Sequence, residues 1–239
     1  MNLDEILNAL FPRGHQVSVD QQVIAGNAET AAGPVLVLGT ADAAAIDHRI
    51  ALTLAARVLD TIARHPRRPI VFLVDTSGQA LSRAAELLCL NGSFAHLAQC
   101  VDLARRQGHP TLSLVTANAV SGGFLSFGLM ADRAYALSDV QVRVMDLKAM
   151  ARVTKIAHER LLELAASSPI FAPGAENYRR MGAIEAIWPA PSEALLLQAL
   201  ADIAEAGQSD LRMEKGLQRG GRTLAANVAQ IADTAGTGV

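Results

Sequence analysis

The sequence predicts an α/β fold in which buried parallel strands alternate with helices. Residues 70–74 and 111–117 are mainly apolar runs rich in β-branched side chains, which is typical of strands covered on both faces. Each run is followed by a polar, glycine-containing turn and then by a helical segment. Hydrophobic residues make up 51% of the 239 residues, which is enough for a substantial core. We therefore expect βαβ units in a single domain.

The chain begins with a predicted helix over residues 2–10. Roughly alternating apolar residues predict a strand over residues 15–24 that turns at residues 25–27, and a second strand follows at residues 35–38. Their closeness in sequence favours an antiparallel hairpin or meander. Residues 47–64 form the clearest amphipathic helix, because apolar side chains recur at four-residue steps on one side.

Helices and short strands continue through the rest of the chain. A long helix is predicted over residues 82–107, and Gly108 is placed just beyond its C-cap. The turn at residues 121–123 opens a buried helix. Further predicted elements are strands at residues 134–137 and 140–144, helices at 148–166, 178–181, 192–206 and 223–232, a break at 167–169, and a flexible tail from about 234 to 239.

Polar glycine turns follow both central strands, at residues 75–79 and 118–123. Ligands bind at the carboxyl ends of parallel strands, where such turns gather. Gly122 and Gly123 let the backbone approach a ligand closely, and unpaired N–H groups at the start of the next helix favour negative charge. The sequence therefore predicts a site for an anion or an oxyanion at these turns.

Composition and motifs exclude several classes of function. A net charge of −2, from 21 basic and 23 acidic residues, and an aromatic content of 4% argue against nucleic-acid binding. The sequence has no GxxxxGK[ST] phosphate loop, no CxxC pair and no histidine spacing typical of a metal site. It lacks the basic start of a secretory signal and any apolar run of about 18 residues. We expect a cytoplasmic protein without a membrane span.

Four short segments together resemble the crotonase-like carboxyltransferase family, and within it the gamma subunits of malonate decarboxylase. They are Asp-Thr-Ser-Gly at 75–78, Ser-Gly-Gly-Phe at 121–124, Ala-Asp-Arg-Ala-Tyr at 131–135 and Gly-Ala-Ile-Glu-Ala-Ile at 182–187. The resemblance implies a crotonase/ClpP-like fold of repeated ββα units, in one domain over residues 1–239.

The resemblance also implies a shared reaction. Such subunits act with a homologous beta subunit to convert a malonyl thioester on an acyl carrier protein into an acetyl thioester and CO₂. An acyl carrier protein transferase subunit is a further implied partner. No cofactor is expected on this chain, because the substrate is carried on the phosphopantetheine-type group of the carrier protein. The implied backbone oxyanion hole comprises Gly78, Gln79, Gly122 and Gly123, and the implied substrate contacts are Ser77, Ser121 and Phe124.

Other interpretations stay open at the level of sequence. The chain could be the carboxyltransferase subunit of a biotin-dependent enzyme, although it has no Ala-Met-Lys-Met biotin-attachment motif, or a non-catalytic scaffold. Ser121 could be a nucleophile, but no histidine lies between Gly122 and Ala157 to activate it. Asp75 could be catalytic or could cap a turn. The sequence does not identify the group that protonates the enolate.

Overall fold

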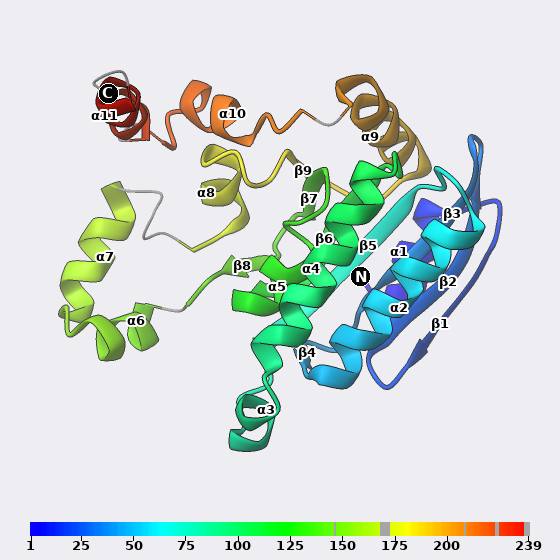
Figure 1. The fold of residues 1–239 in the computed structure, drawn as a ribbon, viewed down its shortest axis with the longest axis horizontal. Helices are drawn as coiled ribbons and strands as arrows, with labels where there is room; N and C mark the ends of the chain where they lie inside the picture. Colours follow the sequence, from blue (N-terminus) through cyan, green and yellow to red (C-terminus); the bar gives the residue numbers. More distant parts are fainter. Residues whose placement is uncertain (146, 168–172, 208, 223–224, 237–239) are drawn as a thin grey trace.

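A mixed β-sheet forms the centre of the computed structural model, which describes residues 1–145, 147–167, 173–207, 209–222 and 225–236 (Figure 1). The strands are β1 (His15–Asp20), β2 (Val23–Thr30), β3 (Gly33–Thr40), β4 (Ala44–Ile46), β5 (Ile70–Gln79), β6 (Thr111–Val120), β7 (Arg133–Leu137), β8 (Gln141–Arg143) and β9 (Ala186–Trp188). They lie in the order β1-β2-β3-β5-β6-β7-β9, with β4 paired to β5 and β8 paired to β6. The prediction of an α/β fold is confirmed.

The sheet changes character at β3. The first three strands form an antiparallel meander, whereas β3, β5, β6, β7 and β9 run parallel. The antiparallel arrangement was predicted, but from two strands rather than three. The amino-terminal half of β5 pairs with β3, and its carboxyl-terminal half pairs with β4. In the same way β6 pairs first with β7 and then with β8. Each of the two long strands therefore pairs with a main-path neighbour along its first half and with a short strand along its second half.

The helices complete the layers. They are α1 (Leu3–Leu10), α2 (His48–Arg64), α3 (Arg83–Leu87), α4 (Leu90–Arg106), α5 (Ser121–Phe127), α6 (Leu147–Thr154), α7 (His158–Ser167), α8 (Ala175–Arg180), α9 (Glu193–Ala206), α10 (Arg212–Gln218) and α11 (Ala225–Gly236). Figure 1 shows α2 and α4 side by side in front of the strands, with α1 behind them. The carboxylate of Asp47 caps α2 by accepting from the Ile50 amide at 2.8 Å.

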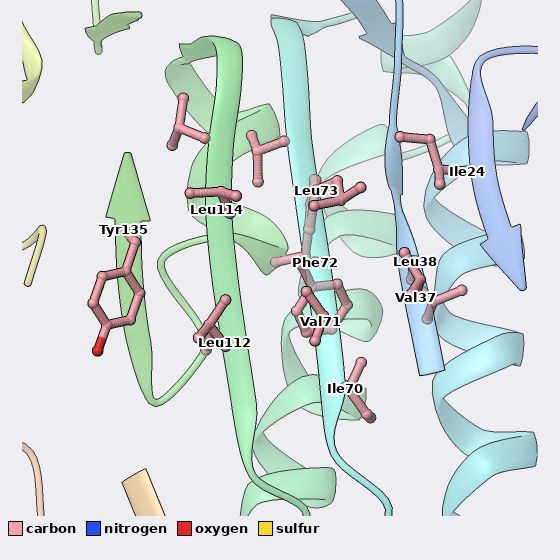
Figure 2. Close-up of a cluster of buried hydrophobic side chains, with 14 of the residues drawn as sticks. Ile24, Val37, Leu38, Ile70, Val71, Phe72, Leu73, Leu112, Leu114 and Tyr135 are labelled. Carbon is pink, nitrogen blue, oxygen red and sulfur yellow. The ribbon is translucent and has the colours of Figure 1, made fainter. Parts of the chain in front are cut away.

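The core lies across the parallel strands. Figure 2 shows side chains from β2, β3, β5, β6 and β7 gathered around the centre of the sheet, among them Phe72 and Leu114. All five residues of the predicted strand at 70–74 are fully buried, which explains their continuous apolar character. Burying one such side chain contributes about 1.5–3 kcal/mol to folding.

Two predicted boundaries near the amino terminus and in the long helix are wrong. The chain turns at Gln21 and Gln22, whose φ angles of 45° and 68° suit a two-residue hairpin. Gly26 instead lies inside β2. The position requires glycine because a Cβ atom there would lie 2.0 Å from the carbonyl oxygen of Gln16 in β1. Most of β2 was not predicted, because residues 25–27 resemble a turn in sequence. The helix predicted over residues 82–107 is interrupted at Cys89, where a φ of 62° separates α3 from α4.

Further differences lie in the second half of the chain. The helix predicted over residues 148–166 is divided into α6 and α7 near Lys155, whose φ is 61°. Short β4 and β9 and helix α10 were also not predicted, because each is too brief to show periodicity in sequence. The predicted break at 167–169 falls partly outside the described residues. Of the predicted tail, residues 234–236 form the end of α11, and 237–239 lie outside the described residues.

Within the described parts of the chain, the model contains no helix that is both long enough and apolar enough to cross a membrane.

Candidate active site

The site is built at the carboxyl-terminal ends of β5 and β6, where the short strands β4 and β8 pair with them. Their pairing shifts register between Val74 and Thr76, so that β6 bulges against β5. Asp75 fills this irregularity: its carboxylate accepts from the Asn118 amide at 3.1 Å, from Asn118 Nδ2 at 2.9 Å and from the Ala43 amide at 2.9 Å. Three donors occupy this carboxylate, so Asp75 holds neighbouring strand ends together. It caps adjoining segments rather than only its own turn.

Thr76 organises the turn that follows. Its side chain is fully buried, and its hydroxyl donates to the Ala44 carbonyl at 2.7 Å. The same oxygen accepts from the Gly78 amide at 3.0 Å. The expectation of a free donor at Gly78 is therefore corrected: a φ of 107° turns the chain so that this amide meets the threonine two residues earlier.

The Ser-Gly-Gly turn lies directly against this segment. A Cβ atom built on Gly123 would lie 2.7 Å from Thr76 Oγ1 and 3.0 Å from Gly78 Cα. The two predicted glycine turns are thus in contact, and only glycine fits at position 123. Ser121 has a φ of 50°, which is strained for a residue with a side chain.

The first turn of α5 offers backbone donors. Gly122, Gly123 and Phe124 all lie within this turn, where N–H groups have no helical acceptor. Among the residues that the structure describes, no side chain caps this helix. These amides can donate to an oxyanion that approaches the turn. Phe124 is 2% exposed and its side chain belongs to the core, so a substrate contact at this residue would come from its backbone.

Gln79 supplies a polar atom without a partner. Its Oε1 is buried and accepts no hydrogen bond from any described residue, and it lies 3.4 Å from the position that a Cβ on Gly122 would take. The ring of Phe94 in α4 lies 3.3 Å from that same position. The turn therefore faces both an aromatic ring and an acceptor that a ligand N–H could satisfy. Ser77 is exposed and Ser121 is half-buried beside them.

The sequence analysis missed Thr76 and Phe94 as parts of this site. Thr76 has a local signal, because a threonine two residues before a turn glycine commonly bonds to its amide. Phe94 has none, because it lies on a helix far from the turn in sequence. No group of three or more His, Cys, Asp or Glu side chains that could hold a metal ion occurs in the described parts of the chain.

Paired glycine turns at the ends of parallel strands, with short strands extending those ends, define an α/β subunit of the carboxyltransferase, crotonase-like class. A chain of transcarboxylase 12S shares this fold, with a TM-score of 0.70 over 84% of this chain and 41% of that chain at 18% identity. The profile of the malonate decarboxylase gamma subunit (MdcE) matches residues 41–235. The chain belongs to the malonate decarboxylase gamma subunit family.

Two solved structures and one characterised protein are similar to the chain. A Pseudomonas malonate decarboxylase hetero-tetramer in complex with coenzyme A matches with a TM-score of 0.80 and 27% identity, over 95% of this chain and 97% of that one. A Pseudomonas malonate decarboxylase MdcD–MdcE hetero-dimer matches at 0.78 and 25%, over 96% and 97%. The malonyl-S-ACP:biotin-protein carboxyltransferase MADD of Malonomonas rubra is 32% identical over 180 residues. That match spans 70% of this chain and 62% of MADD.

Proposed function

We propose that this chain is the gamma subunit of a malonate decarboxylase, and that it completes an active site with a homologous beta subunit. The proposed reaction converts malonyl-S-acyl carrier protein into acetyl-S-acyl carrier protein and CO₂. The observation that carries the proposal is the contact between the two glycine turns, which presents the amides of Gly122 and Gly123 at the ends of β5 and β6. Family membership and the similar MdcD–MdcE hetero-dimer support it.

The chemistry needs stabilisation of one developing charge. When the C–C bond to the carboxylate breaks, CO₂ leaves and the electron pair stays on the thioester as an enolate. Backbone donors aimed at the enolate oxygen lower this barrier by roughly 3–4 kcal/mol each. In the proposal Gly122 and Gly123 are those donors. Gly78 packs against Gly123 and so holds the second turn in place. Gln79, Ser121 and the exposed Ser77 are the proposed contacts of the arriving substrate.

The proposed substrate arrives on the phosphopantetheine-type group of an acyl carrier protein, and this chain itself holds no cofactor. An acyl carrier protein transferase subunit that loads the carrier is a further proposed partner. Amide N–H groups along such an arm match the unpaired Oε1 of Gln79, which accepts from no described group.

A second candidate is carboxyl transfer to a biotin protein. The similarity to MADD favours it, because that protein is named for this transfer from malonyl-S-ACP. Both reactions pass through the same enolate, so the backbone donors would serve either one. They differ in the fate of the carboxyl group, which leaves as CO₂ in one and joins biotin in the other.

The test is CO₂ release from malonyl-S-carrier protein, measured with this chain alone, with a homologous beta subunit alone, and with the mixture, all without biotin. We expect release only from the mixture, which would support a shared site. If release requires an added biotin protein, carboxyl transfer replaces decarboxylation as the function. Full activity of the beta subunit alone would show that this chain is a non-catalytic scaffold.

A further inference from the structure

A serine and a histidine far apart in sequence form a close pair at the amino-terminal ends of two helices. Ser93 Oγ in α4 lies 2.9 Å from Nδ1 of His48, the first residue of α2. His48 Nε2 lies 3.0 Å from the carbonyl oxygen of Ala85 in α3. A carbonyl oxygen can only accept, so Nε2 carries a proton and Nδ1 is the atom that exchanges one with Ser93. A serine hydroxyl, an imidazole and a group that orients the imidazole are the parts of an acid–base pair.

Residues close in sequence to both members of the pair contact the segments that form the glycine turns. Ile46, two residues before His48, pairs with Gln79 in the sheet. Phe94, the residue after Ser93, is the ring that packs on Gly122. His48 is thus two residues from a residue that contacts the proposed oxyanion site, and Ser93 is one residue from another. Both side chains are half-buried, so they remain accessible for exchange with water.

We propose that Ser93 and His48 deliver the proton that completes the reaction. The inference rests on the proposed function, in which an enolate forms at the glycine turns. Loss of CO₂ leaves an electron pair that must take up one proton, and the oxyanion donors do not supply it. In the proposal Ser93 is the catalytic acid that meets the enolate carbon, and His48 is the positioning residue behind it.

The step balances in protons and electrons. The step requires a proton on each ring nitrogen of His48, with Nε2–H donated to the Ala85 carbonyl and Nδ1–H donated to Ser93 Oγ. The enolate electron pair forms a C–H bond with the Ser93 hydroxyl proton, while Ser93 Oγ takes the proton from His48 Nδ1. The products are an acetyl thioester, neutral serine and neutral imidazole, and water then reprotonates His48. No oxidant, reductant or metal is required.

The test uses the reverse of this step. The complex of this chain with its beta partner is incubated with acetyl-S-carrier protein in D₂O, and deuterium entering the acetyl methyl group is followed by mass spectrometry. CO₂ release from malonyl-S-carrier protein is measured in parallel. Ser93→Ala and His48→Gln are each expected to slow exchange at least 100-fold, in the range of general acid–base catalysis. Ser93→Thr keeps a hydroxyl and is expected to restore exchange.

Two control variants separate proton transfer from support of the fold. Ser82→Ala removes the cap whose Oγ accepts from the Ala85 amide at 3.0 Å. It loosens α3 but keeps the side chains of both Ser93 and His48. His96→Gln removes another imidazole from α4, whose Nε2 lies 3.7 Å from Cys100 Sγ. We expect near wild-type exchange from both controls.

Three outcomes decide the question. Wild-type exchange in Ser93→Ala and His48→Gln would overturn the proposal, and so would an equal loss in Ser82→Ala, because the pair would then act only by tying helices together. Methyl exchange requires the same enolate in decarboxylation and in carboxyl transfer. A wild-type complex that exchanges deuterium but releases no CO₂ without biotin therefore overturns the proposed function and leaves this inference standing.

Discussion

The hydroxyl of Thr76 joins two strands and one turn at the candidate site. It donates to the Ala44 carbonyl in β4 and accepts from the Gly78 amide in β5, while its oxygen touches the face on which Gly123 packs. One fully buried atom thus fixes the spacing of three backbone segments. Such a hydroxyl is expected to matter for stability because its partners have no access to water.

Replacing Thr76 with valine tests this role. Valine keeps the shape but leaves the Gly78 amide and the Ala44 carbonyl without partners, at a cost of about 1–3 kcal/mol for each group. We expect the free energy of unfolding, measured in urea, to fall accordingly. Thr76→Ser keeps the hydroxyl and loses one methyl group, which costs about 0.8 kcal/mol. Equal losses in the two variants would show that the hydroxyl contributes nothing.

Gly123→Val tests the backbone site directly. The added side chain would meet Thr76 Oγ1 at 2.7 Å and the Gly78 backbone at 3.0 Å, so the turn must move. We expect turnover of the complex to fall by about 100- to 1,000-fold, the effect of losing one oxyanion donor. The control is Gly92→Ala in α4, where the new Cβ meets only the exposed Cys89 side chain, at 3.2 Å. Full turnover by a folded Gly123→Val complex would favour the scaffold interpretation.

At the scale of elements, the break between α3 and α4 determines where α3 lies relative to α2. Cys89 adopts a φ of 62°, and this left-handed residue redirects the chain between the two helices. Figure 1 shows α3 projecting beyond α4 at the lower edge of the molecule. His48 binds the Ala85 carbonyl in α3, so the break brings α3 within reach of α2.

Cys89→Gly is expected to stabilise the chain. A left-handed conformation costs a non-glycine residue about 1–2 kcal/mol, and glycine loses about 0.5–1 kcal/mol more entropy on folding, so the net gain is about 0.5–1 kcal/mol. Thermal or urea unfolding measures the difference. Cys89→Ala removes the same thiol but keeps the strained conformation, so it is expected to bring no gain. A gain as large in Cys89→Ala would mean that the thiol, not the backbone, is responsible.

At the scale of the whole molecule, a charged cluster ties the carboxyl-terminal helices to the edge of the sheet. Glu185, just before β9, lies 2.5 Å from Lys215 Nζ and 3.2 Å from Arg219 Nη2, both brought by α10 and the residue that follows it. Arg133 in β7 lies 3.8 Å from the same carboxylate. Burial and this negative charge both raise the pKa of Tyr135 nearby, and burial raises the pKa of Tyr178.

Because the pKa values of Tyr135 and Tyr178 are raised in the folded protein, we expect the free energy of unfolding to fall at alkaline pH. The unfolded chain releases tyrosine protons near pH 10, whereas the folded protein keeps them to higher pH. Their contribution is therefore complete below pH 10 and declines above it, by about 1.4 kcal/mol per pH unit for each tyrosine. Urea unfolding between pH 9 and 11 measures the slope. Tyr135→Phe is expected to flatten it, and an unchanged slope would contradict the assignment.

The sequence by itself determined the features that depend on neighbouring residues. Continuous apolar runs predicted β5 and β6, a four-residue apolar repeat predicted α2, and glycines marked the turns after both strands. Each follows from local geometry, because strand burial, helix periodicity and glycine conformation are expressed within a few residues. The interruption of the long helix at Cys89 was not predicted, because cysteine as a residue type does not favour a left-handed backbone.

Only the tertiary structure decided which distant residues come into contact at and around the candidate site. Asp75 with Asn118, Ser93 with His48, and Phe94 with Gly122 are pairs separated by many residues. Their approach depends on the register of parallel strands and on the packing of α2, α4 and α5, which the whole core sets. A shift of one residue in register would turn side chains to the opposite face. Local sequence therefore specified the turns, and the packed sheet specified what they face.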